Sequence, residues 1–167
     1  MSENTDRRLL VLWADDVQKG PNDKVNLLGV YGTEMWLPEP TTVPQIYAFV
    51  EISTSLARPF KSIRLMVRAT NESSDSDADV DSGTQEILLD FTVPASALSQ
   101  VIETAARGES EGKHPEGANI RTALRVGLPI SGLKVNKRRY LTVRAETEEG
   151  PMFGETLLVL VRAAQPT

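Results

Sequence analysis

The strongest candidate for a metal site is a run of acids at alternate positions. Four aspartates make up the run, namely Asp75, Asp77, Asp79 and Asp81. Glu86 follows eleven residues after the first of them, the spacing that a calcium-binding loop uses for its last ligand. Val80, however, stands where such a loop needs glycine for its sharp turn. The alternative interpretation is a solvated acidic loop over 71–83 whose like charges keep it extended.

Two further features have residue types that acid–base or nucleophilic chemistry uses. Asp15 and Asp16 are adjacent, but neighbours on a strand point to opposite faces, so the two carboxylates do not converge without a bulge. His114 is the single histidine and falls in a polar loop over 108–118, and no G-x-S-x-G motif supplies a serine nucleophile. We therefore expect a protein that is not an enzyme and holds no metal or cofactor. A calcium-dependent binder, or a hydrolase using these acids, remains the alternative.

The composition is that of one globular domain. The chain has 167 residues, a mass of 18.3 kDa and 40% apolar residues, enough for a single core over residues 1–167 with short flexible termini. Because there is no cysteine, disulfide scaffolds, thiolate zinc sites and cysteine nucleophiles are excluded. Eighteen bases against 23 acids give a net charge of −5, which disfavours a nucleic-acid partner.

The charges are nevertheless distributed unevenly along the chain. Residues 71–90 contain seven acids and no base, whereas residues 117–145 contain seven bases and no acid. The densest basic group lies in one expected turn and consists of Lys134, Lys137, Arg138 and Arg139. We expect this turn to meet carboxylates of a protein partner or of the acidic segment of a neighbouring copy. The alternative is that both segments are simply solvated faces.

Short apolar runs rich in β-branched residues, separated by Gly, Pro and Asn, predict the elements that hold these side chains. The expected strands cover 7–17, 24–37, 46–52, 63–69, 86–93, 120–130, 139–145 and 152–163. One helix is expected over 94–107, with Pro94 near its first turn and Gly108 as its C-cap. About eight strands and one crossover helix predict an all-β fold, an antiparallel Ig-like or C2-like sandwich.

Several residues have a specific expected place in this sandwich. The first two runs are expected to form a hairpin, and Gly29 and Gly32 indicate a bulge or a close backbone approach in its second strand. Trp13, Trp36 and Tyr31 are expected in the core, with an exposed position as the alternative for Trp36. Trp36, beside a proline-rich stretch, is a candidate for an exposed interface anchor.

Two parts of the sequence carry a resemblance to a family. The opening, with Ala14-Asp15-Asp16 and then Leu28-Gly29-Val30-Tyr31-Gly32, resembles the start of an uncharacterised family of small bacterial and phage proteins. The C-terminal stretches LRVGLPISGL and RRYLTVRAE are similar to that family's proline-bearing strand and tyrosine-containing hairpin. The resemblance covers roughly the first and last fifty residues. It implies a small β-sandwich with no assigned activity and no catalytic residue.

These observations together predict a non-enzymatic protein that works by surface contact. The leading expectation is a phage virion component, such as a decoration, minor capsid or tail-associated protein, whose partners are other copies or capsid and tail proteins. The alternative is a cytoplasmic bacterial or phage accessory module that binds a protein or a small ligand. No run approaches the about 20 apolar residues of a membrane span, and none is typical of a signal peptide. We therefore expect the protein in the virion or the bacterial cytoplasm, with no membrane partner.

Overall fold

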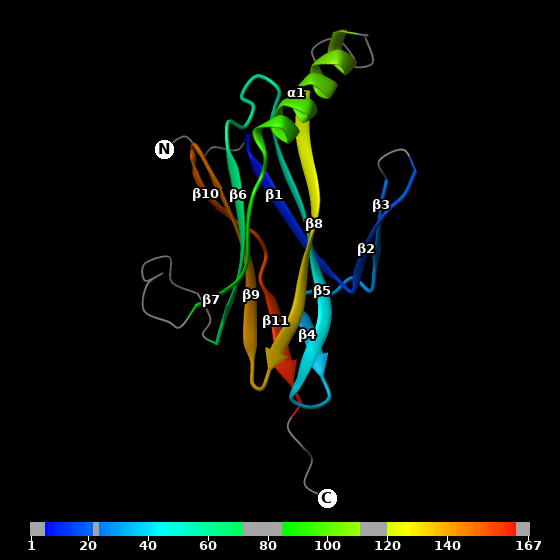
Figure 1. Cartoon of the computed structure of the whole chain (residues 1–167), viewed down its shortest axis with the longest axis vertical. Helices are drawn as coiled ribbons and strands as arrows, with labels where there is room; N and C mark the ends of the chain where they lie inside the picture. The colour runs from blue at the N-terminus through cyan, green and yellow to red at the C-terminus, as the bar shows by residue number, and fades with distance from the viewer. Residues whose placement is uncertain (1–5, 22–23, 72–84, 111–119, 163–167) are drawn as a thin grey trace, which may run out of the picture.

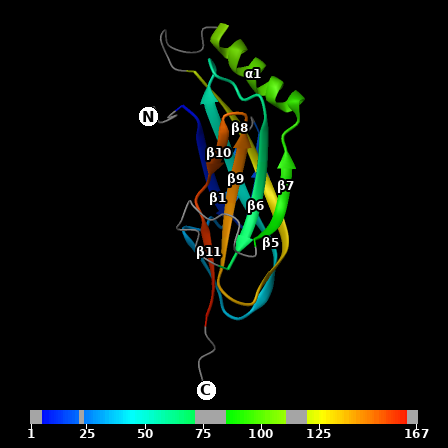
Figure 2. The same ribbon diagram turned by 90° about the vertical axis from the view of Figure 1, so that its left-hand side faces the viewer.

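The structure of the chain is a computed structural model, and it describes residues 6–21, 24–71, 85–110 and 120–162 (Figure 1). Two β-sheets pack face to face, and one helix lies across one end of the pair (Figures 1 and 2). The described residues thus form the mostly β, sandwich-like fold with one short helix that the sequence predicts. Their helix is too short and too polar to cross a membrane.

The smaller sheet has three strands in the order β1–β5–β8. They are β1 (Arg8–Ala14), β5 (Thr41–Ser55) and β8 (Arg121–Val135), and both pairs are antiparallel. The central strand β5 is covered along its inward face, as its period-two alternation predicts. The side chains on that face have no exposed surface, and they are Ile46, Ala48, Val50 and Ile52.

The larger sheet has six strands, with β10 attached to β9 beside the path β4–β11–β9–β6–β7. Its strands are β4 (Glu34–Leu37), β6 (Ile63–Thr70), β7 (Glu86–Thr92), β9 (Arg139–Thr147), β10 (Gly150–Phe153) and β11 (Leu157–Val161). The pairs are antiparallel except for β4 with β11, which is parallel and departs from the expected arrangement. Together the sheets contain more strands than expected, because several predicted runs divide into two.

The core lies between the two sheets. The inward residues of β6 are at most 1% exposed, and they are Ile63, Leu65, Val67 and Ala69. Trp13 is 2% exposed and lies in the same core, as expected. Its indole Nε1 donates a hydrogen bond to the Glu155 carbonyl at 3.3 Å, so the one polar atom of this buried ring has a partner.

The predicted hairpin between 7–17 and 24–37 is wrong over most of its length. Next to the turn, β2 (Asp16–Lys19) pairs with β3 (Val25–Leu28), and beyond them a single bridge joins Trp13 to Tyr31. The rest of the two runs separates, because β1 pairs with β5 and β4 lies in the other sheet. The reason is that the apolar part of the first run is buried on β5, and the chain bends at Asp15 before β2 begins. The resulting β2–β3 hairpin projects from the sandwich (Figure 1).

The close backbone approach expected at Gly29 is confirmed. Gly29 has φ +63°, and a Cβ on it would overlap the carboxylate of Asp15. Gly32 has open space around its Cα instead, so only the first of the two glycines is required by the fold. Gly127 of β8 is needed for packing as well, because a Cβ there would lie 3.0 Å from Cγ1 of Val17.

The helix α1 (Ala95–Ser110) confirms the predicted element but not its end. Leu98 is buried against the core, and Val101 and Ile102 border the same end of the sandwich. Gly108 does not end the helix as expected, because the helix continues to Ser110. Among the described glycines the left-handed backbone of a C-cap occurs only at Gly29, Gly132 and Gly150, so Gly108 keeps a helical conformation.

A buried arginine joins the N-terminal strand to the β9–β10 turn. The side chain of Arg7 is 4% exposed and lies 4.6 Å from the ring centroid of Phe60. Its guanidinium donates to Glu148 at 2.5 Å and to the hydroxyl of Thr147 at 2.9 Å, and it forms a second ion pair with Glu149 at 3.0 Å. These partners offset the free-energy cost of burying the charged guanidinium.

Candidate functional site

The adjacent acids Asp15 and Asp16 have separate partners, as their strand geometry predicts. Asp15 accepts a hydrogen bond from the hydroxyl of Tyr31. Asp16 accepts bonds from the Val17 amide and the Gln18 side chain, both at 2.8 Å. Burial and then the Asp15 carboxylate raise the pKa of Tyr31 to about 12. Tyr31 packs against the core only in part.

The acidic run Asp75, Asp77, Asp79 and Asp81 lies outside the described residues, as does His114. Glu86, the last candidate ligand of the calcium hypothesis, is described and is engaged elsewhere. Its carboxylate accepts a hydrogen bond from Arg139 at 2.6 Å. Among the described residues, no group of three acids or histidines is placed to hold a metal ion.

Several cations of the basic segment are paired within the chain itself. Arg121 pairs with Asp6 at 3.3 Å, Arg125 with Glu51 at 2.6 Å, and Arg144 with Glu146 at 3.0 Å. Arg139 not only pairs with Glu86 but also donates to the Lys134 carbonyl at 3.0 Å, with only 12% of its side chain exposed. Much of the segregated charge is therefore neutralised inside one copy, and Arg139 is a structural tie between β8, β9 and β7.

The remaining predicted cations stay at the surface of the β8–β9 turn. Lys134, Lys137 and Arg138 are exposed, and none forms an ion pair with a described residue. The Arg138 guanidinium lies 5.5 Å from the centroid of the Tyr140 ring. A cation held over an aromatic ring in this way is fixed in direction and remains open to an acid from another molecule.

Trp36 is 54% exposed and belongs to a group of side chains on the outer face of the larger sheet. The strand register places it opposite Leu160, and it places Leu158 between Glu34 and Tyr140. Residues opposite each other in a sheet share a face, so these side chains are contiguous. We call this group the contact face, and it consists of Glu34, Trp36, Arg138, Tyr140, Leu158 and Leu160.

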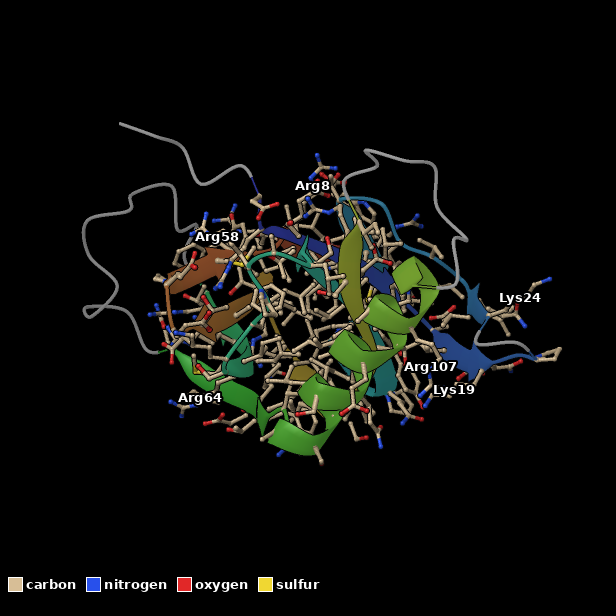
Figure 3. The ribbon with its side chains drawn as sticks, turned by 90° about the horizontal axis from the view of Figure 1, so that it is seen from above. Arg8, Lys19, Lys24, Arg58, Arg64 and Arg107 are labelled. Atoms are coloured by element: carbon tan, nitrogen blue, oxygen red, sulfur yellow. The ribbon has the colours of Figure 1, made fainter. Side chains whose placement is uncertain are left out.

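A cleft of about 680 Å³ lies beside β8. It is lined by the tip of the β2–β3 hairpin, by one side of α1 around Val101, and by residues 121–125 of β8. Figure 3 shows Lys19 and Lys24 on the projecting hairpin beside the helix. We call this recess the β8 cleft. It was not predicted from the sequence, because it depends on where a hairpin and a helix distant in the chain come to lie.

No known protein-family model matches the chain, and no curated protein matches its sequence. The functional interpretation therefore rests on the two surfaces just described. Of the predicted interaction residues, the structure brings Trp36 and Arg138 to one face. It places Lys134 near the end of β8 and Lys137 on the adjoining turn, and it directs Arg139 into the molecule.

Proposed function

We propose that this protein is a non-enzymatic interaction protein that binds a second copy of itself through the contact face. The observation that carries the proposal is the exposed Trp36, which continues into Leu160, Leu158 and Tyr140 across three neighbouring strands. Tryptophan, tyrosine and arginine are the residue types that dominate protein interface energetics. A contiguous group of them on the outer face of the larger sheet supports a protein contact.

The arrangement of charge on this face favours a two-fold pair of copies. Glu34, Leu158 and Tyr140 form one row across β4, β11 and β9, with Arg138 stacked on the tyrosine. A two-fold axis through the middle of that row would bring Glu34 of one copy to Arg138 of the other, and the reverse. The apolar side chains in the middle would then be buried, with an ion pair at each end.

Light scattering behind size-exclusion chromatography tests this proposal. We expect the mass to rise from 18.3 kDa towards twice that value as the concentration increases. Trp36→Ser should keep the chain monomeric at concentrations where the wild type associates. Ile87→Ser is the matched control, because Ile87 is 55% exposed on β7, at the other edge of the same sheet.

Exchanging the charges of Glu34 and Arg138 tests whether these two residues pair across the interface. Glu34→Arg alone and Arg138→Glu alone should each weaken association, since each places like charges opposite one another. The double variant should restore it. A wild-type protein that stays monomeric throughout, or equal effects of Trp36→Ser and Ile87→Ser, would contradict the proposal.

The proposed setting is a phage or phage-derived particle, in which capsid or tail proteins would be further partners. This part of the proposal is supported by the resemblance of residues 14–16 and 28–32 to small bacterial and phage proteins. Mass spectrometry of purified particles tests it directly. Detection of the chain at a fixed ratio to the major capsid protein is expected. Its absence from intact particles would favour the accessory binding module instead.

A further inference from the structure

The β8 cleft exposes one edge of the smaller sheet. Among the described strands, β8 has a partner, β5, on one side only, and residues 121–125 lie at the wall of the cleft. Leu124 and Val126 are only partly buried there, whereas Leu128 and Ile130 further along the same inward face are fully covered. Over residues 121–126 this edge is therefore both open and partly apolar.

The backbone of this edge is arranged to accept another strand. The Leu56 amide donates to the Ile120 carbonyl at 2.9 Å, so the backbone of Ile120 points towards β5. The register then runs without a shift through residues 121–131, and alternate residues of an antiparallel edge turn their N–H and C=O groups away from the partner. In the cleft these residues are Arg121, Ala123 and Arg125.

Proline protects the rest of this edge. Pro129 is one of the alternate residues whose backbone points away from β5, so its missing N–H removes no hydrogen bond to β5. A proline at an outward position prevents a neighbouring strand from pairing there. A further strand is thus prevented from pairing with β8 at Pro129 but not between Arg121 and Arg125. Along these residues the helix and the hairpin form the walls of the cleft.

The charge of the cleft indicates what would bind. Its described lining residues include four cations, Lys19, Lys24, Arg121 and Arg125, and no acid. The two arginines have acidic partners in the chain, Asp6 and Glu51, but the two lysines form no ion pair with a described residue. Among the described lining residues the excess of positive charge therefore comes from Lys19 and Lys24, although the protein is acidic overall.

We propose that the β8 cleft binds an acidic peptide of another protein in extended conformation, which adds a strand to the edge of β8. The residues opposite Arg121 and Arg125 would be acids, and the one opposite Ala123 would be small. The residues between them would be apolar and would face Leu124 and the helix. The motif is therefore acid–apolar–small–apolar–acid.

A second copy of the same edge is a poor occupant for electrostatic reasons. A symmetric antiparallel pair centred on Ala123 would place Arg121 of one copy directly opposite Arg125 of the other. Like charges at directly opposed positions destabilise a strand pair. The cleft also lies on elements that the contact face does not use, so each proposal can fail without the other.

Fluorescence anisotropy with the full chain and a labelled peptide, Ser-Glu-Val-Ala-Val-Glu-Ser, tests the proposal. The peptide should bind, and replacing both glutamates by lysine should abolish binding. Methylation of the central alanine nitrogen should weaken affinity about tenfold, because that amide would donate to the Ala123 carbonyl. Methylation of a neighbouring valine nitrogen, whose amide points away from β8, is the matched control.

Variants of the protein give a second test at the same residue. Ala123→Pro removes the outward N–H without removing a hydrogen bond to β5, and it should weaken binding. Ala123→Val keeps that N–H and should bind normally. Equal affinity for the two methylated peptides, or no binding of the acidic peptide by the wild type, would overturn the proposal. Tighter binding of a peptide with the sequence of residues 73–83 would also overturn it, since the occupant would then be another copy of the chain.

Discussion

Replacing Glu148 by glutamine is expected to weaken the fold by removing one side of the Arg7 ion pair. The Glu148 carboxylate accepts a hydrogen bond from Arg7 at 2.5 Å and from the amides of Lys61 and Ser62 at 3.1 and 3.2 Å. It therefore ties the start of β1 and the segment before β6 to the β9–β10 turn. Burial by itself raises the pKa of Glu148, but these hydrogen bonds outweigh it and lower the pKa from 4.5 to about 2.

The size of the effect follows from that shift. A pKa lowered from 4.5 to about 2 corresponds to a contribution of about 3 kcal/mol to the free energy of unfolding at neutral pH. The carboxylate keeps 22% of its surface exposed, and Glu149 still pairs with Arg7 at 3.0 Å. We therefore expect Glu148→Gln to lose about 2 kcal/mol at pH 7, or about 6 °C in Tm for a domain of this size.

Urea unfolding followed by circular dichroism, from pH 7 down to pH 2, measures the effect and its pH dependence. Because the folded-state pKa lies below the unfolded value, the contribution is complete above pH 4.5 and is lost as the pH falls towards about 2. The difference between wild type and Glu148→Gln should shrink over that range. Glu39→Gln, at an exposed acid, is the control. Equal stability at pH 7, or a difference that does not change with pH, would refute the reasoning.

Three further outcomes are expected from substitutions and titration. Gly29→Ala should destabilise the fold by about 2 kcal/mol, because of its positive φ and its overlap with Asp15, whereas Gly32→Ala should be nearly neutral in a thermal melt. The absorbance of tyrosinate should show one tyrosine ionising near pH 12, and Asp15→Asn should lower the pKa of Tyr31. Leu65→Ala should cost about 3 kcal/mol in urea unfolding, since the side chain is fully buried. A destabilised Gly32→Ala, a Tyr31 pKa unchanged by Asp15→Asn, or a neutral Leu65→Ala would contradict the corresponding contact.

The sequence predicts the strands that alternate and the helix, because burial of one face leaves a direct period in the chain. The inward residues of β5 and β6 are the clearest case, from Ile46 to Ile52 and from Ile63 to Ala69. Which strands pair with one another leaves no such periodic pattern in the sequence. The expected hairpin between the first two runs was wrong because nothing in β1 distinguishes pairing with its neighbour in sequence from pairing with β5.

The candidate sites likewise differ in how far the sequence predicts them. The expectation that Trp36 lies in the core was wrong, because the side chain is 54% exposed; the proline-rich stretch beside it had indicated exposure as the alternative, and its role as an anchor stays a prediction. The inward course of Arg139 could not be foreseen, because its partner Glu86 is distant in sequence. The β8 cleft was missed for the same reason, since its walls come from three separate segments.

The most direct measurement of the proposed function is the fluorescence of Trp36 during association. In a Trp13→Phe background Trp36 is the only tryptophan, and it is 54% exposed in the single chain. As concentration rises and the mass doubles, its emission should shift to shorter wavelength and iodide should quench it less, because the contact face becomes buried. A mass that doubles while the emission and quenching of Trp36 stay unchanged would contradict the proposal that this face is the interface.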